Sequence, residues 1–381
     1  MIDTVILCIP KNKVHMTDMS AHGVSGWDLQ SRTSVYSKFV KNPSRKDTES
    51  GLYFPRLTGF RRKNGTLEWD ATVKIEFSAP KLIYQNNVDE LTDEQFGAVA
   101  RALQDRMGKM GVRVAIADIE AADVTAVHYS KNILLANGFT SQYVIGELNK
   151  INLNKRFDLT RARYINDGQS LYAYTEMHSL VVYDKIADLI RGKKRAIDRE
   201  QTAEQLSLFG PLAKRPEPLE ILRFEVRLCK KRKLNSLFKK LGFAEKPSFK
   251  DVFASQKSEA VLMYYWDTML NGNMCMLFAH SLTHKELLKQ ILLTNRKIKA
   301  KDAVYLTGLV MLLQDGNGAR ELRTALSKHA NSRTWYRIAA DAREIGAALS
   351  NLKPREWHGQ VQRALKSYKP LHTADLPCKE L

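Results

Sequence analysis

Apolar and polar residues alternate along several segments in the first two-thirds of the chain, a pattern typical of strands in a sheet with one buried face. The clearest example is residues 221–228, in which every second position is apolar. An Asn64–Gly65 pair separates two other segments and predicts a hairpin turn between them. The segments that we expect to be extended are 1–7, 51–59, 66–77, 112–116, 124–129, 170–183 and 221–228, and residues 170–183 form either one long strand or a hairpin.

The first segment with helical spacing of apolar residues is 93–110. Thr92 precedes it, and Gln95 follows Thr92 by three positions, which is the spacing of a capping box. Residues 143–151 form a second expected helix. After residue 230 the pattern is almost entirely helical, over residues 260–271, 284–293, 300–314, 319–329 and 333–349. We therefore predict an α+β fold, with an N-terminal antiparallel β-sheet domain and flanking helices over residues 1–250, and an all-α C-terminal region over residues 251–381.

The chain carries a formal net charge of +19 over 381 residues, and 44% of its residues are hydrophobic. The hydrophobic fraction supports a sizeable core and argues against global disorder. So large a positive charge favours a polyanionic partner. Nucleic acid is the commonest such partner, because each neutralised phosphate releases a condensed counterion. An anionic membrane surface and a ribosome-type scaffold are the alternatives on charge alone.

The four cysteines are scattered without a C-x-x-C pair, which argues against a disulfide framework or a zinc ribbon and favours reduced thiols in a cytosol. The apolar run at the N-terminus is short and includes an acid, unlike a signal peptide. The most apolar stretch, residues 260–279, is interrupted by Asp267, Asn271 and Asn273, whereas a membrane-spanning helix needs about 20 mostly apolar residues. We expect a soluble, cytoplasmic protein.

The strand predicted at residues 221–228 separates two sets of side chains, because alternate residues of a strand share a face. Its apolar residues point into a core, while Arg223, Glu225 and Arg227 line the opposite face. Two interpretations are open. The polar side is either a solvated sheet face with alternating charges, or an active-site face where a carboxylate holds Mg²⁺ and guanidinium groups hold phosphate.

Three other strands carry residue types suited to phosphate chemistry. Glu76 lies on the polar face of one strand, and His128 lies near the end of another, as a structural residue or, beside a carboxylate, as a metal ligand. No His-x-His metal-binding pair occurs. Tyr183 ends a third strand, with Lys185 two positions further on. A tyrosine there is commonly a packing residue, but its phenol can attack a phosphodiester if its proton is removed or screened by a nearby cation.

Four motifs occur in an order that resembles the gene II/gene X replication initiator family of filamentous phages and related plasmids. They are Ile75-Glu76-Phe77-Ser78-Ala79-Pro80-Lys81-Leu82 followed by Asn86-Asn87, then Val127-His128-Tyr129-Ser130-Lys131-Asn132, then Tyr183-Asp184-Lys185, and finally Leu222-Arg223-Phe224-Glu225-Val226-Arg227-Leu228. Two further matches extend the similarity over nearly the whole chain: Met1-Ile2-Asp3 with Pro10, and Ser332-Arg333-Thr334-Trp335-Tyr336-Arg337.

The resemblance implies a rolling-circle initiator, an endonuclease that nicks the plus strand of a supercoiled origin and later rejoins the displaced strand. Its nucleophile maps onto Tyr183, which would leave a 5′-phosphotyrosine and a free 3′-OH. The expected partners are double-stranded supercoiled origin DNA, the displaced single strand, and the helicase and polymerase of a bacterial host, in whose cytoplasm the protein would act.

Such a reaction needs charge to be neutralised on the phosphate oxygens and on the leaving 3′-oxygen. We expect a divalent ion, Mg²⁺ or Mn²⁺, to supply part of this charge and cationic side chains the rest. The candidate catalytic residues are Tyr183, Lys185, Arg223 and Arg227, and the candidate metal ligands are Glu225, His128, Asp184 and Glu76. The lack of a G-x-x-x-x-G-K-[ST] loop fits religation from a phosphotyrosine, which needs no ATP.

Basic residues follow the strand at 221–228 directly. The passage 191–218, which we expect to be a surface excursion or a connection between strands, begins with a similarly basic run. Such runs are either solvated surface or contacts to the DNA backbone. Residues 319–345 are typical of a helix-turn-helix, or of an ordinary helical hairpin with Trp335 in its core, and both interpretations are open. The candidate DNA-binding residues are Lys230, Lys231, Arg232, Lys233, Arg333, Tyr336 and Arg337.

Two other function classes are the alternatives. A non-catalytic origin-binding initiator of a phage or plasmid would share the charge and the helical DNA-binding region, but would have no use for Tyr183. A basic RNA-binding structural protein predicts neither tyrosine chemistry nor a preference for a supercoiled origin.

Overall fold

The structure is a computed structural model. It describes residues 1–17, 22–27, 34–43, 47, 50–63, 69–151, 162–165, 169–191, 219–270, 282–295, 297–314, 318–326, 329, 332–348, 356–367 and 369–376. The expected turn at Asn64–Gly65 and nearly all of the basic passage 191–218 lie outside these residues.

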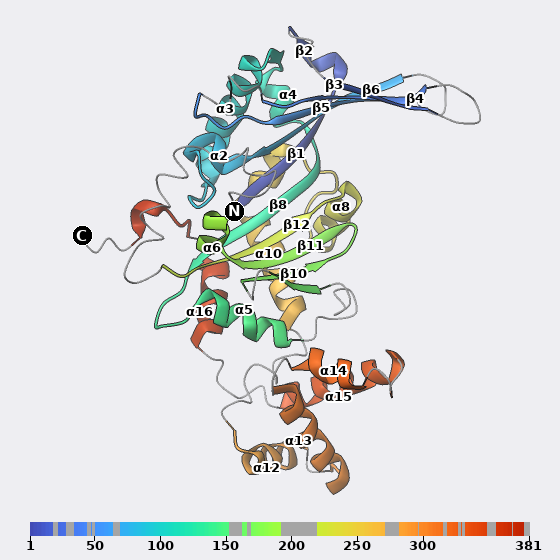
Figure 1. The fold of residues 1–381 in the computed structure, drawn as a ribbon, viewed down its shortest axis with the longest axis vertical. Helices are drawn as coiled ribbons and strands as arrows, with labels where there is room; N and C mark the ends of the chain where they lie inside the picture. The colour runs from blue at the N-terminus through green and yellow to red at the C-terminus, as the bar shows by residue number, and fades with distance from the viewer. Residues whose placement is uncertain are drawn as a thin grey trace.

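Within this described part, ten strands form one sheet in the order β3-β4-β5-β6-β1-β8-β12-β11-β10-β9, and neighbouring strands run antiparallel (Figure 1). The strands are β1 (Ile2–Pro10), β3 (His22–Trp27), β4 (Ser34–Lys41), β5 (Arg56–Lys63), β6 (Trp69–Ser78), β8 (Asp123–Leu134), β9 (Ala162–Ile165), β10 (Ser170–Tyr174), β11 (His178–Asp184) and β12 (Ile221–Leu228). A separate ribbon pairs β2 (His15–Met16) with β7 (Val112–Arg113). With the helices below, this sheet confirms the predicted α+β class.

Most helices lie where apolar spacing predicts them, and the capping box of Thr92 and Gln95 is present at the start of the expected helix. The helices before the end of the sheet are α2 (Ala79–Tyr84), α3 (Phe96–Lys109), α4 (Ile116–Glu120), α5 (Ser141–Lys150) and α6 (Lys185–Arg191). The later helices are α8 (Lys231–Lys240), α9 (Phe249–Phe253), α10 (Ser255–Leu270), α12 (His284–Thr294), α13 (Ala300–Gln314), α14 (Ala319–Leu326), α15 (Ser332–Ala348) and α16 (Glu356–Ser367). Short 3-10 turns are η1 (Lys11–Lys13), η2 (Asp93–Gln95) and η8 (Thr373–Asp375).

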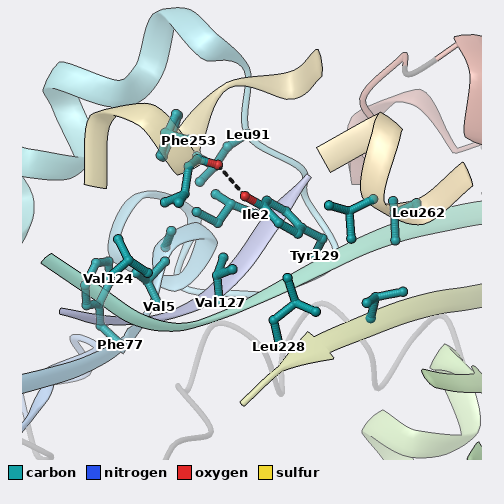
Figure 2. Close-up of a cluster of buried hydrophobic side chains, with 14 of the residues drawn as sticks. Ile2, Val5, Phe77, Leu91, Val124, Val127, Tyr129, Leu228, Phe253 and Leu262 are labelled. Carbon is teal, nitrogen blue, oxygen red and sulfur yellow. Dashed lines mark hydrogen bonds between the residues drawn. The ribbon is translucent and has the colours of Figure 1, made fainter. Parts of the chain in front are cut away.

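One face of the sheet packs against helices and forms the main core. Alternate residues of β1, β6, β8 and β12 on this face are buried together with residues of α3, α8, α9, α10 and α16. Figure 2 shows part of this core, where Tyr129 of β8 points toward α9 and its phenol donates a hydrogen bond of 2.9 Å to the carbonyl oxygen of Val252. The apolar residues of these alternating strands therefore lie on this face and pack in the core.

The other face of the sheet, which we term the open face, carries the polar half of the same strands. On β1 and β6 its residues are half-buried or exposed, as Cys8 and Lys74 illustrate, except near the start of β1. On β8 and β12 several of its polar residues are buried, for example Asn132 and Glu225, whereas Arg227 at one end is half-buried. The change from exposed to buried polar groups marks the part of the open face where the candidate site lies.

The C-terminal helices pack in two sets. Helices α12 to α15 share a small apolar cluster that includes Val310 and Trp335. Helices α10 and α16 instead pack in the main core with the sheet, through residues such as Trp266 and Trp357. The predicted boundary after residue 250 thus falls before α10, which the packing groups with the sheet. In the described chain, no helix is long and apolar enough to cross a membrane.

Candidate active site

Strand pairing brings the predicted catalytic residues together on the open face. Tyr183 of β11 is paired with Arg223 of β12, and Arg223 is paired with Asn132 of β8. Glu225 lies on β12 two positions after Arg223. Arg227 lies two positions further along the same strand and is paired with His128 of β8. Because paired residues and residues two apart share a face, these side chains form one patch.

Glu225 is the centre of this patch. Its Oε2 accepts hydrogen bonds from the Tyr183 phenol at 3.2 Å and from Nε of Arg223 at 3.3 Å. Its Oε1 accepts a shorter hydrogen bond of 2.6 Å from Nε of Arg227. His128 Nδ1 lies 3.8 Å from the same oxygen. A single carboxylate therefore bridges two guanidinium groups and also holds the phenol of Tyr183.

Burial and charge act on these groups in opposite directions. Burial disfavours the charged form of Glu225, but Arg227 and Arg223 outweigh it and hold the pKa of this carboxyl well below its usual value. Burial raises the pKa of Tyr183 well above its usual value, although Arg223 acts in the opposite direction. Near neutral pH, Glu225 is thus ionised and Tyr183 is a neutral phenol. The phenol can therefore donate its hydrogen bond to the carboxylate.

Arg223 is almost completely enclosed by protein acceptors, and its side chain is 2% exposed. Besides Glu225, it donates to the carbonyl oxygen of Asn87 at 2.7 Å and to Oδ1 of Asn132 at 3.3 Å. Its remaining terminal nitrogen lies 2.9 Å from Oδ2 of Asp3. Since all of its nitrogens are engaged, Arg223 orients the carboxylate of Glu225 and is poorly placed to grip a phosphate.

Arg227 is the opposite case. Its side chain is 35% exposed, and only Nε is engaged, by Glu225. Within the described residues its two terminal nitrogens have no hydrogen-bond partner. A guanidinium group that is anchored at Nε and open at its other end can bind a phosphate oxygen with both terminal nitrogens.

Lys185 lies near the tyrosine, at the start of α6. It is 1% exposed, donates a hydrogen bond of 2.9 Å to Oδ1 of Asn87, and its Nζ lies 5.9 Å from the centre of the Tyr183 ring. Burial, with Arg223 acting in the same direction, lowers the pKa of Lys185 to about 7. Lys185 therefore supplies a cation beside the nucleophile, and this lysine loses its own proton near neutral pH.

The four candidate metal ligands do not come together. Glu225 and His128 are neighbours, and burial lowers the pKa of His128. Asp184 caps α6 by accepting a hydrogen bond of 2.9 Å from the Ala187 backbone, and Glu76 is exposed on β6, three strands away from β12. Among the described residues, no group of three or more His, Cys, Asp or Glu side chains is arranged to hold a metal ion. The residues present thus do not fit a closed metal site.

The candidate DNA-binding residues lie in two places. Lys230 and Arg232 are exposed where β12 passes into α8, and Lys231 there pairs with Asp123. Lys233 on the same helix is half-buried. On α15 the side chains of Arg333 and Arg337 are exposed and Tyr336 is half-buried, while Trp335 is buried in the small helical cluster. This burial is compatible with both a helix-turn-helix and a helical hairpin.

Three residues that hold the site were not among the predicted site residues: Asp3, Asn87 and Asn132. Strict alternation along β1 places Asp3 on the buried face with Val5. A register irregularity between Ile2 and Val5 breaks this alternation, and Asp3 reaches Arg223 on the open face. The only signal available for these residues was their presence in the motifs that carry the family resemblance.

Comparison of the chain with family models, with curated proteins and with solved structures found no match.

Proposed function

We propose that the protein is a site-specific DNA strand transferase, which nicks one strand of a supercoiled origin with Tyr183 and rejoins that strand later. The observation that supports this best is the hydrogen bond from the Tyr183 phenol to the ionised Glu225, with Arg227 open beside it. The net charge of +19 favours a nucleic-acid substrate. The order of the motifs along the chain resembles that of a rolling-circle initiator.

In the proposed first step, the Tyr183 oxygen attacks the phosphorus of a phosphodiester. The phenol loses its proton to solvent through its hydrogen bond to Glu225 as the new oxygen–phosphorus bond forms. The bond from phosphorus to the 3′-oxygen breaks, and that oxygen takes up a proton and leaves as a free 3′-OH. The 5′ end remains on the protein as a phosphotyrosine.

Charge develops on the phosphate during this attack, and two side chains are placed to offset it. Arg227 presents its terminal nitrogens from the exposed edge of the patch, and Lys185 places a buried amine 5.9 Å from the centre of the Tyr183 ring. Arg223 and Asp3 act through Glu225 by fixing its position.

The reverse step restores the DNA strand. A 3′-OH attacks the phosphotyrosine, the phosphodiester forms again, and Tyr183 leaves with a proton. One bond is exchanged for another in each direction, so no nucleotide cofactor is consumed. The candidate metal ligands are dispersed among the described residues, so both steps use groups of the protein alone.

The experiment that tests this function uses a supercoiled circle carrying the DNA that encodes the protein together with its flanks. Wild type and Tyr183→Phe are incubated with the circle in Mg²⁺, in Mn²⁺ and in a chelator, and the products are separated on a denaturing gel. We expect wild type to convert the circle to the open form in at least one condition, and Tyr183→Phe to leave it closed in all. Binding without nicking in every condition would favour a non-catalytic origin-binding initiator instead.

A further inference from the structure

Two tyrosines of β10 lie on the open face next to the candidate site. Tyr172 is paired with Val181 of β11, and Tyr174 with Ser179. Val181 and Ser179 are in turn paired with Glu225 and Arg227. The tyrosines are therefore two strands away from the residues that surround the nucleophile.

The rings of Tyr172 and Tyr174 form a stacked pair. Their centres are 5.2 Å apart and their planes are inclined by 15°. Both side chains are half-buried, whereas Leu171 and Ala173, which alternate with them, are almost fully buried on the helix-covered face. The tyrosine pair thus contributes aromatic surface to the open face and adds little to the main core.

Strands on both sides of this pair carry a cationic residue. Arg163 of β9 is paired with Tyr172, and on the other side Arg227 of β12 lies in the row of Tyr174, with its terminal nitrogens open within the described residues. Glu225 raises the pKa of Arg227 above its usual value, against the effect of burial, and the phenols of Tyr183 and Tyr172 contribute to this shift. A planar aromatic surface beside an open guanidinium group is complementary to a nucleotide, which has a flat base and an anionic phosphate.

We propose that Tyr172 and Tyr174 form a stacking platform for an unpaired DNA base that flanks the phosphodiester attacked by Tyr183. This inference rests on the proposed function, since it names the form of DNA that the same site binds. A base within a duplex has both faces covered by its neighbours, so only a single strand can place a base on the platform. Ser170, on the same strand, is paired with Tyr183, so the platform extends along β10 directly from the nucleophile.

The experiment measures binding of a fluorescein-labelled oligodeoxythymidine of about 12 nucleotides, a length within the range of single-strand binding sites. All proteins carry Tyr183→Phe, which removes cleavage and makes anisotropy a measure of binding alone. The test variant is Tyr172→Leu/Tyr174→Leu, which keeps apolar bulk on the strand. The conservative variant is Tyr172→Phe/Tyr174→Phe, which keeps both rings.

The matched control is Tyr143→Leu. Tyr143 is also partly exposed, at 37%, but it lies on α5, which packs against β10 and β11 from the helix-covered face. We expect the double leucine variant to bind about tenfold more weakly or worse, and the phenylalanine variant and Tyr143→Leu to bind within about twofold of the parent. The dependence of affinity on salt should be unchanged, because stacking releases no counterions.

Three results would overturn the platform. They are equal binding by the leucine variant, equal losses in the leucine variant and in Tyr143→Leu, and tighter binding of duplex DNA or of the matching RNA than of the single DNA strand. Because cleavage plays no part in this measurement, its outcome is independent of the nicking experiment. A platform without nicking would leave the single-strand site standing and remove only the proposed chemistry.

Discussion

The phenol oxygen of Tyr183 lies 3.2 Å from Oε2 of Glu225, on the neighbouring strand of the sheet. The same carboxylate is held by Arg223 and Arg227, so its position is determined before any substrate binds. This arrangement makes Glu225 the residue on which both the shape and the charge of the candidate site depend.

Replacing the carboxylate of Glu225 by an amide tests its contribution both to stability and to nicking. In Glu225→Gln, the amide turns a donor toward an arginine and leaves buried positive charge uncompensated, so we expect the free energy of unfolding to fall by about 3 kcal/mol. We expect nicking to be lost as well. Urea unfolding and the supercoiled-circle assay measure the two effects. The control is Glu76→Gln, exposed on the same face, which should change stability by less than about 0.5 kcal/mol. Equal effects of the two substitutions would contradict the central place of Glu225.

The two arginines of β12 should differ in what they contribute. Arg223→Met removes a buried cation from Asp3 and Glu225, and we expect it to lower the free energy of unfolding by about 3–5 kcal/mol. Arg227→Met removes a partly exposed cation. We expect its loss of unfolding free energy to be about 2 kcal/mol smaller than that of Arg223→Met. Its nicking rate should fall by about 100-fold or more while the fold is kept. Equal stability losses in urea, or normal nicking by Arg227→Met, would show that the roles are assigned incorrectly.

We expect Lys185 to increase the nicking rate without stabilising the fold. Burial lowers its pKa to about 7, which shows that its surroundings disfavour the charge. We expect Lys185→Met to have a free energy of unfolding equal to or above that of wild type, and a nicking rate lower by about 100-fold. Thermal unfolding and the nicking assay provide the two measurements. Lys74→Met, exposed on β6, is the control and should nick normally. A clear loss of stability in Lys185→Met would mean that the amine is a structural group.

Alternation of residues was sufficient to predict which side chains of a strand share the open face. Arg223, Glu225 and Arg227 were assigned to one face of residues 221–228, and the structure has them there, on β12. The same alternation places His178 on the face opposite to Tyr183, and it is buried there, where Nδ1 lies 2.6 Å from the phenol oxygen of Tyr265. A period of two residues is a local property, so the sequence carries it directly.

The order and register of the strands could not be obtained in this way, because strand pairing joins residues that are far apart in the chain. Tyr183 and Asn132 become neighbours of Arg223 only through the order β8-β12-β11. Asp3 was missed for a related reason, since an irregularity in β1 reverses the face expected from alternation. The placement of α10 with the sheet depends on Trp266 packing against Phe224, a contact that helical spacing alone does not indicate.

The most direct test of the account is to identify the covalent bond between protein and DNA. Wild type is incubated with the supercoiled circle that carries its own coding region and flanks, the complex is digested with a nuclease and a protease, and the peptides are analysed by mass spectrometry. We expect one modified peptide, carrying a nucleotide joined through its 5′-phosphate to Tyr183. Nicked circles with free 5′-phosphates and no modified peptide, or a nucleotide on another tyrosine, would contradict it.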